Sequence, residues 1–121
     1  MSKTIMTVDD SASMRQMVRL TLAGAGYEVV EAEHGQDALN KVGAAVPSMV
    51  VTDLNMPVMD GLTLIRNLRA LNSFKGVPIV FLTTESDEDK KRAAKEAGAT
   101  GWLTKPFKQE QLLAVVKKVL G

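Results

Sequence analysis

Polar side chains follow several short apolar segments of this sequence, and their types suit the handling of a phosphoryl group. They are Asp9, Asp10, Asp53, Thr83 and Lys105. Three carboxylates at close range repel one another unless a cation lies among them. A site with only oxygen ligands suits Mg²⁺, which also neutralises the oxygens of a transferring phosphoryl group. With the amine and the hydroxyl as further partners, one carboxylate can act as the nucleophile and accept the group as an acyl phosphate.

These side chains can meet only if the apolar segments are neighbouring strands of one sheet. We expect strands at residues 5–8, 28–31, 49–52, 77–82 and 100–104. Segments of helical periodicity alternate with them, and we expect helices around residues 14–22, 38–42, 64–71, 86–97 and 112–120. Three of the strands are almost continuously apolar, which is typical of a parallel sheet with helices on both faces. The sequence therefore predicts an α/β fold in which the polar side chains meet at the carboxyl edge of the sheet.

Length and composition limit the classes of protein that remain. The chain has 121 residues, of which 45% are hydrophobic, so one domain with a packed core is expected rather than disorder. The net charge of +1 gives no strong field for a nucleic acid. The absence of cysteine excludes disulfides and thiolate sites. Without a signal peptide or an apolar segment of about 20 residues, we expect a soluble, cytoplasmic protein with no membrane contact.

Four motifs, in this order along the chain, resemble those of the receiver domains of response regulators. They are Val8-Asp9-Asp10, Thr52-Asp53-Leu54-Asn55-Met56-Pro57-Val58-Met59-Asp60-Gly61, Leu82-Thr83-Thr84 and Lys105-Pro106-Phe107. The resemblance covers essentially the whole chain. It implies a single flavodoxin-like (βα)5 domain, with a parallel five-stranded sheet of order 2-1-3-4-5 and helices on both faces. It also implies that residues 1–121 are one receiver domain with no output domain.

The same resemblance assigns roles to individual residues. It implies that Asp53 is the phosphoacceptor and that Lys105 and Thr83 contact the phosphoryl group. The implied Mg²⁺ ligands are Asp10 directly, Asp9 through water, Asp53, and Asn55 through its backbone carbonyl. Further implied features are a switch formed by Thr83 and Trp102, control of the lifetime of the acyl phosphate by Asn55 and Glu85, and a cis peptide bond before Pro106.

A finer resemblance, to the CheY-type chemotaxis response regulators, is carried by Thr83-Thr84-Glu85-Ser86 and Gly98-Ala99-Thr100-Gly101-Trp102. It implies a monomeric signalling protein, not an enzyme acting on other molecules, that receives its phosphoryl group from a chemotaxis-type histidine kinase. The implied target is a flagellar motor switch protein or another phospho-dependent partner, bound at the face of the fourth helix, fifth strand and fifth helix. Trp102 departs from the pattern, since this position usually holds Tyr or another smaller aromatic residue.

Three other functions remain open at this point. A single-domain phosphorelay shuttle or phosphate sink would use the same site residues. An aspartyl-phosphate phosphatase usually has its two acids as Asp-x-Asp on the first strand, whereas Asp9 and Asp10 are adjacent. A flavin-binding protein of the same fold would need a Ser-, Thr- or Gly-rich phosphate loop after that strand, where this chain has Asp9-Asp10-Ser11-Ala12.

Several of these residues also have structural interpretations. Asp9 and Asp10 could cap the helix that begins near Ser11 or Ser13, because carboxylates favour the amino end of a helix. Lys105 could be a surface lysine, and Trp102 could be an ordinary core residue. Purely structural roles are expected at Asp60-Gly61 as a turn and cap, at Ser86 with Asp89 as a capping box, and at His34 as a loop residue without a partner nearby.

Overall fold

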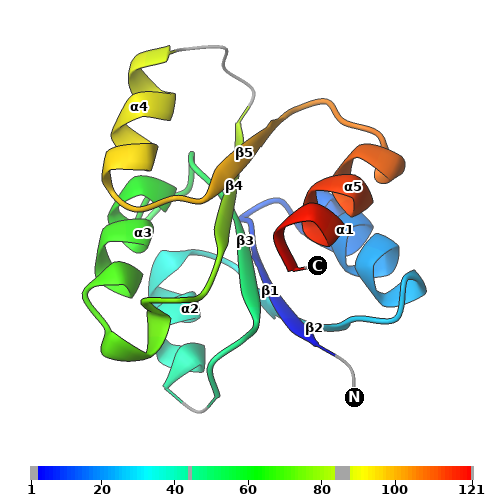
Figure 1. The fold of residues 1–121 in the computed structure, drawn as a ribbon, viewed down its shortest axis with the longest axis horizontal. Coiled ribbons are helices and arrows are strands. Elements are labelled where there is room, and N and C mark those ends of the chain that lie inside the picture. The colour runs from blue at the N-terminus through cyan, green and yellow to red at the C-terminus, as the bar shows by residue number, and fades with distance from the viewer. Residues whose placement is uncertain (1–2, 44, 84–87, 121) are drawn as a thin grey trace.

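The computed structural model describes residues 3–43, 45–83 and 88–120. Five strands form one parallel sheet of order β2-β1-β3-β4-β5 (Figure 1). The strands are β1 (Thr4–Val8), β2 (Glu28–Ala32), β3 (Met49–Asp53), β4 (Ile79–Thr83) and β5 (Gly101–Thr104). The helices are α1 (Ala12–Gly24), α2 (Gly35–Val42), α3 (Gly61–Arg69), α4 (Glu88–Glu96) and α5 (Gln109–Leu120), with a short 3-10 helix, η1 (Asn72–Phe74), after α3. The predicted fold class and strand order are confirmed.

Helices cover both faces of the sheet. α1 and α5 lie on one face, and α2, α3 and α4 lie on the other (Figure 1). Every residue of β3 and β4 is buried, which explains the continuous apolar sequence of these central strands. One core packs the sheet against α2, α3 and α4, and a second packs it against α1 and α5. None of the helices that the structure describes combines the length and the apolar character needed to span a bilayer.

The strand register places the predicted site residues at one edge. Val8 pairs with Thr52, and the next residue along β3, Asp53, pairs with Leu82 on β4. Asp9 follows Val8 directly, so it lies beside Asp53 at the carboxyl edge of the sheet. The fold therefore brings together side chains that are far apart in the sequence, as the parallel topology requires.

Three helices begin at a side chain that accepts a backbone N–H. Ser11 caps α1, His34 caps α2 and Asp60 caps α3. Asp60 thus has the structural role expected for it, and the cap of α1 is Ser11 rather than Asp9 or Asp10. The expectation that His34 has no partner nearby is wrong, because its Nδ1 accepts the backbone N–H three residues further on, at 3.1 Å.

Most elements begin or end a few residues away from their predicted bounds. β4 begins at Ile79 rather than at residue 77, since Pro78 has no N–H to donate to a neighbouring strand. The short helix η1 was not expected. In the described part of the chain α4 begins at Glu88, and the predicted capping box that starts at Ser86 lies outside the described residues.

Candidate functional site

Three carboxylates and one ammonium group meet at the carboxyl edge of the sheet. Asp9, Asp10 and Asp53 each offer an oxygen, and these oxygens all lie within 4.8 Å of one another. The Nζ atom of Lys105, from the segment after β5, lies 3.3 Å from Oδ2 of Asp53 and 3.5 Å from Oδ2 of Asp9. The structure therefore brings together four of the residues that the sequence pointed to.

Asp9 is held firmly by its neighbours. Its backbone N–H donates to the carbonyl of Ala32 at the end of β2, at 3.1 Å. Its Oδ1 accepts the N–H of Ser11 at 2.9 Å, which fixes the side chain in the turn before α1. The guanidinium of Arg15 donates to the Asp9 carbonyl at 2.7 Å. Sequence reasoning did not identify Arg15, although its position one turn into a helix that follows two acids was a usable signal.

Asp53 presents one of its two carboxylate oxygens to the cluster. Oδ1 accepts the N–H of Leu54 at 2.8 Å, so Oδ2 is left facing Lys105. The backbone carbonyl of Asp53 accepts the hydroxyl of Thr52 at 2.9 Å. Gly61 packs directly on this turn, and a Cβ built on it would overlap the backbone of Asp53 and Leu54. A glycine at the start of α3 is therefore needed for the close approach of helix and strand end.

Burial and the charges of the two other acids disfavour the ionised form of the Asp9 carboxyl group. Burial is the main cause that raises the pKa of Asp9, and the charges of Asp53 and Asp10 raise it further. The N–H of Ser11 and the charge of Lys105 act in the opposite direction but do not offset the burial. Oδ2 of Asp9 is buried and accepts no hydrogen bond.

This arrangement fits a hard divalent cation. A buried carboxylate oxygen without a hydrogen-bond donor, next to two more carboxylates, is an unfavourable state that a cation would relieve. All the ligand atoms on offer are oxygens, which Mg²⁺ prefers. Asp10 is exposed, whereas Asp9 and Asp53 are buried, so the cluster opens to solvent on the side of Asp10.

The remaining predicted residues lie at or near the same edge. Thr83 is the last residue of β4 and is buried, and its carbonyl accepts the N–H of Lys105 at 2.7 Å. The Lys105–Pro106 peptide bond is cis, as expected. Asn55 is exposed in the segment after β3. Glu85, predicted to act on the lifetime of an acyl phosphate, lies outside the described residues.

Trp102 lies on the surface, not in the core. The side chain is on β5, the residue is 38% exposed, and its ring stacks on Phe81 with centroids 6.2 Å apart. The Nζ atoms of Lys91 and Lys95, both on α4, lie 5.0 Å and 5.9 Å from the centre of the indole ring. The interpretation of Trp102 as an ordinary core residue is therefore wrong. The cation–π contacts were missed, because the register of α4 against β5 is not readable from the sequence.

Comparisons with known proteins agree with this geometry. The family model described as "Response regulator receiver domain" matches residues 5–117. Chemotaxis protein CheY1 of Helicobacter pylori is 42% identical over 119 residues, which cover 97% of this chain and 96% of that protein. The phosphate regulon transcriptional regulatory protein PhoB of Pseudomonas aeruginosa is 38% identical, and the match covers 98% of this chain and 52% of PhoB. The structure of chemotaxis response regulator CheY4 of Vibrio cholerae superposes with a TM-score of 0.95 at 45% identity, covering 99% of this chain and all of that one.

Proposed function

This chain belongs to the family of response regulator receiver domains, and we propose that it is a phosphorylation-activated switch of the CheY type with Asp53 as the phosphoacceptor. Receiver domains are signalling modules of two-component systems rather than enzymes acting on other molecules. The observation that carries the proposal is the cluster of Asp9, Asp10 and Asp53 with Lys105 at the carboxyl edge of the sheet. We also propose that residues 1–121 form one receiver domain, as the family match over residues 5–117 supports.

Asp53 is better placed than Asp9 to be the nucleophile. One oxygen of Asp53 accepts the Leu54 N–H, which orients the carboxylate and leaves Oδ2 directed at the cluster. Asp9 is 1% exposed and Asp53 is 7% exposed, so an incoming phosphoryl group reaches Asp53 more easily. Oδ2 of Asp53 attacks phosphorus, the bond from phosphorus to the donor breaks, and the group remains as an acyl phosphate.

The acidic residues are suited to hold Mg²⁺. We assign Asp10 as a direct ligand, Asp9 as a ligand through water, and Asp53 and the backbone carbonyl of Asn55 as the remaining protein ligands. When bound, Mg²⁺ supplies positive charge against the oxygens of the transferring group. The cost of burying Asp9 without a hydrogen-bond donor on Oδ2 supports this assignment, because the cation removes that cost.

Lys105 and Thr83 are the proposed partners of the phosphoryl oxygens. The ammonium group of Lys105 already lies 3.3 Å from Oδ2 of Asp53 and is only 13% exposed, so its charge acts in a partly dry site. Thr83 ends the strand next to β3 and places a hydroxyl on the same edge. Asn55 and Glu85 are proposed to control access of water to the acyl phosphate, and thereby its lifetime.

The output of the switch is proposed to be the face formed by α4, β5 and α5. A phosphoryl group adds a charge of about −1.5 to −2 at Asp53, which draws the hydroxyl of Thr83 toward it. Trp102 on β5 then changes its position, and the face changes with it. The phosphoryl donor is proposed to be a chemotaxis-type histidine kinase, and the partner a flagellar motor switch protein. The relatives named as chemotaxis proteins, CheY1 and CheY4, support this choice.

The decisive experiment is the intact mass of the protein after incubation with acetyl phosphate, with Mg²⁺ or with EDTA. We expect one added phosphoryl group in the wild type with Mg²⁺ and none with EDTA. Asp53→Asn, which keeps the shape of the side chain, should add none. Asp60→Asn is the matched control and should be phosphorylated normally, because asparagine caps a helix as well as aspartate does. A phosphoryl group on Asp53→Asn, or on the wild type in EDTA, would contradict the assignment.

A further inference from the structure

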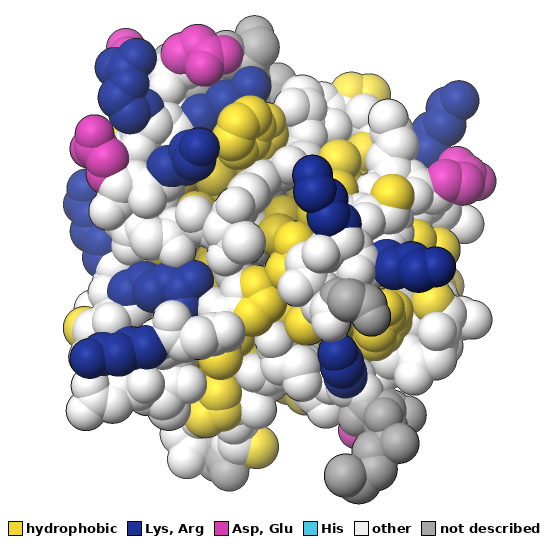
Figure 2. Space-filling model, viewed as in Figure 1, with side chains coloured by type: hydrophobic (Ala, Val, Ile, Leu, Met, Phe, Trp, Pro, Cys, Tyr) yellow, Lys and Arg dark blue, Asp and Glu magenta, His cyan; other side chains and the backbone are white. Residues whose placement is uncertain are grey.

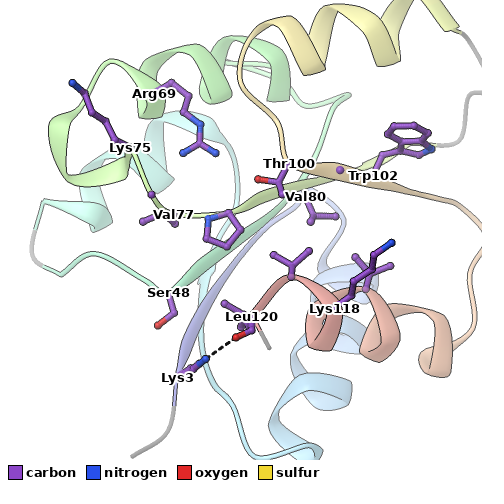
Figure 3. Close-up of a pocket in the computed structure, with 15 residues that line it drawn as sticks. Lys3, Ser48, Arg69, Lys75, Val77, Val80, Thr100, Trp102, Lys118 and Leu120 are labelled. Atoms are coloured by element: carbon purple, nitrogen blue, oxygen red, sulfur yellow. Dashed lines mark hydrogen bonds between the residues drawn. The ribbon is translucent and has the colours of Figure 1, made fainter.

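A second concave site lies at the opposite edge of the sheet. It is a cavity of about 870 Å³ that is lined by the residues just before four of the strands: Lys3 before β1, Ser48 before β3, Pro78 before β4 and Thr100 before β5 (Figure 3). Because the strands are parallel, their amino ends share one edge, and the length of the strands separates this cavity from Asp53. The volume lies within the range of small-molecule sites, about 300–1,000 Å³.

The cavity has an apolar floor. Val77, Pro78 and Val80 line it from β4 and the segment before it, and Val115 and Val119 line it from α5. Figure 3 shows the side chains of Val77 and Val80 between the segment that carries Arg69 and helix α5. A hydrocarbon or aromatic body of a ligand would find apolar contacts here.

Basic side chains surround this floor. Lys3, Arg69, Lys75 and Lys118 line the cavity, and none of the lining residues is acidic within the part of the chain that the structure describes. None of the four forms an ion pair with a described carboxylate. Figure 2 shows the same face, with Lys and Arg side chains around yellow apolar patches and with Asp and Glu near its margins. Lys3 donates from its Nζ atom to the carbonyl of Leu120 at 2.9 Å (Figure 3). Among the described residues the cavity is thus a concave site with positive charge that no carboxylate offsets.

Arg69 is held in place as part of this site. Its Nε donates to the carbonyl of Gly98 at 2.9 Å, and another guanidinium N–H donates to the carbonyl of Phe74. Gly98 has a φ of +113°, and a Cβ there would lie 2.7 Å from the Arg69 side chain. Burial lowers the pKa of Arg69, and both its partners are neutral carbonyls. A guanidinium fixed by carbonyls is preorganised for an anion, since little side-chain freedom is lost when the anion binds.

We propose that this cavity binds a small organic anion, with an apolar body on the floor between β4 and α5 and a carboxylate, sulfate or phosphate group beside one of the four cationic side chains that line it. The apolar floor and the cationic side chains select for both parts of such a ligand. A free inorganic anion would use only the cations, and a neutral apolar molecule would use only the floor.

The test uses 8-anilinonaphthalene-1-sulfonate as the anionic probe and N-phenyl-1-naphthylamine, which lacks the sulfonate, as its neutral counterpart. Fluorescence titrations measure affinity and stoichiometry, and amide chemical shifts locate the bound probe. We expect saturable binding of one sulfonate probe, with the largest shifts at Val77, Thr100 and Val119, and weaker binding of the neutral probe. Inorganic phosphate at the same concentration should cause much smaller shifts.

Charge-reversed variants provide the matched comparison. Lys75→Glu combined with Lys118→Glu changes two exposed cavity residues, and Lys108→Glu combined with Lys117→Glu changes two exposed residues outside it by the same charge. Lys117 and Lys118 are neighbours in the last turn of α5, so the substitutions at these two positions carry a similar helix-dipole cost. The cavity variant should bind the sulfonate probe about tenfold more weakly, and the control should change by less than about twofold.

Four results would overturn the proposal. Equal weakening in the two variants would mean that the probe responds only to overall charge. The largest shifts in another part of the protein would place the probe elsewhere. Equal affinity for the anionic and neutral probes, or equal shifts with inorganic phosphate, would show that the site does not recognise an anion with an apolar body.

Discussion

The substitution Asp9→Asn is expected to stabilise the metal-free protein. The Asp9 carboxylate is 1% exposed, its Oδ2 has no hydrogen bond, and burial raises its pKa, so keeping it ionised costs free energy. Asparagine has nearly the same shape and keeps an oxygen that can accept the Ser11 N–H now bound at 2.9 Å. The substitution removes the buried charge with little loss of structure.

The size of the effect follows from the surroundings of this carboxylate. A buried polar group without a partner costs about 1–3 kcal/mol. Lys105 offsets part of that cost, because its Nζ lies 3.5 Å from Oδ2 of Asp9. We therefore expect the free energy of unfolding in EDTA to rise by about 1–2 kcal/mol. For a domain of this size that is a rise in Tm of about 4–8 °C.

Mg²⁺ should reverse the order of the two proteins. A cation that binds only the folded state at about a hundred times its Kd adds about 2.7 kcal/mol of stability. The wild type should gain this amount, and Asp9→Asn should gain less, because one of three carboxylates is gone. Thermal unfolding in EDTA and in a series of Mg²⁺ concentrations measures both effects.

Asp37→Asn is the control for the change of Asp to Asn. A hydrogen bond from the Glu33 N–H is the main cause that lowers the pKa of Asp37, so its carboxylate stabilises the fold and the substitution should slightly lower Tm. Its response to Mg²⁺ should match that of the wild type. The reasoning about Asp9 is wrong if Asp9→Asn is less stable than the wild type in EDTA, or if both proteins gain equally from Mg²⁺.

Three further outcomes are expected. Because the folded-state pKa of Asp9 is raised, the folded protein binds more protons than the unfolded chain between about pH 4 and that raised pKa. The stability of the wild type relative to Asp9→Asn, both in EDTA, should therefore fall as the pH rises through this window and then level off. Urea titrations over a pH series measure this. Gly61→Ala should lose about 2–4 kcal/mol of stability and slow phosphorylation by acetyl phosphate, because a Cβ at position 61 overlaps the backbone at the end of β3. The control Gly24→Ala, where a Cβ meets open space, should not lose stability. Lys91→Met should lower the free energy of unfolding by about 0.5–1 kcal/mol, because the cation–π contact with Trp102 is lost. Trp102 is the sole tryptophan, so a change in the fluorescence emission of the protein reports the loss directly.

Much of the fold could be predicted because two simple signals agree along the chain. The apolar segments at β1, β3 and β4 indicated strands covered on both faces, and the helical spacing between them indicated the crossovers. Parallel topology then required that the residues after each strand meet at one edge. Asp9, Asp53 and Lys105 were accessible to sequence reasoning for this reason, since their positions depend on strand ends and not on details of packing.

Features that depend on the packing of one element against another could not be predicted. Lys91 and Lys95 lie over Trp102 only because α4 takes a particular register against β5. The same holds for the cavity at the amino edge, where Lys3 and Lys118 come from opposite ends of the sequence. Each residue is an ordinary surface lysine in the sequence, and only the fold gives it a neighbour.

Under the proposed mechanism, the packing of α4 would allow a local change at Asp53 to reach the proposed partner face. In the described part of α4 the buried residue is Ala94, so little apolar surface fixes this helix to the sheet. The indole of Trp102 is held near α4 by cation–π contacts with lysines, each worth about 0.5–1 kcal/mol at an exposed site. A phosphoryl group brings a charge of about −1.5 to −2 to a partly dry site, where its interactions exceed those contacts. If the proposed switch has two arrangements of this face, its weak attachment to the sheet means that a modest preference at the site is enough to choose between them.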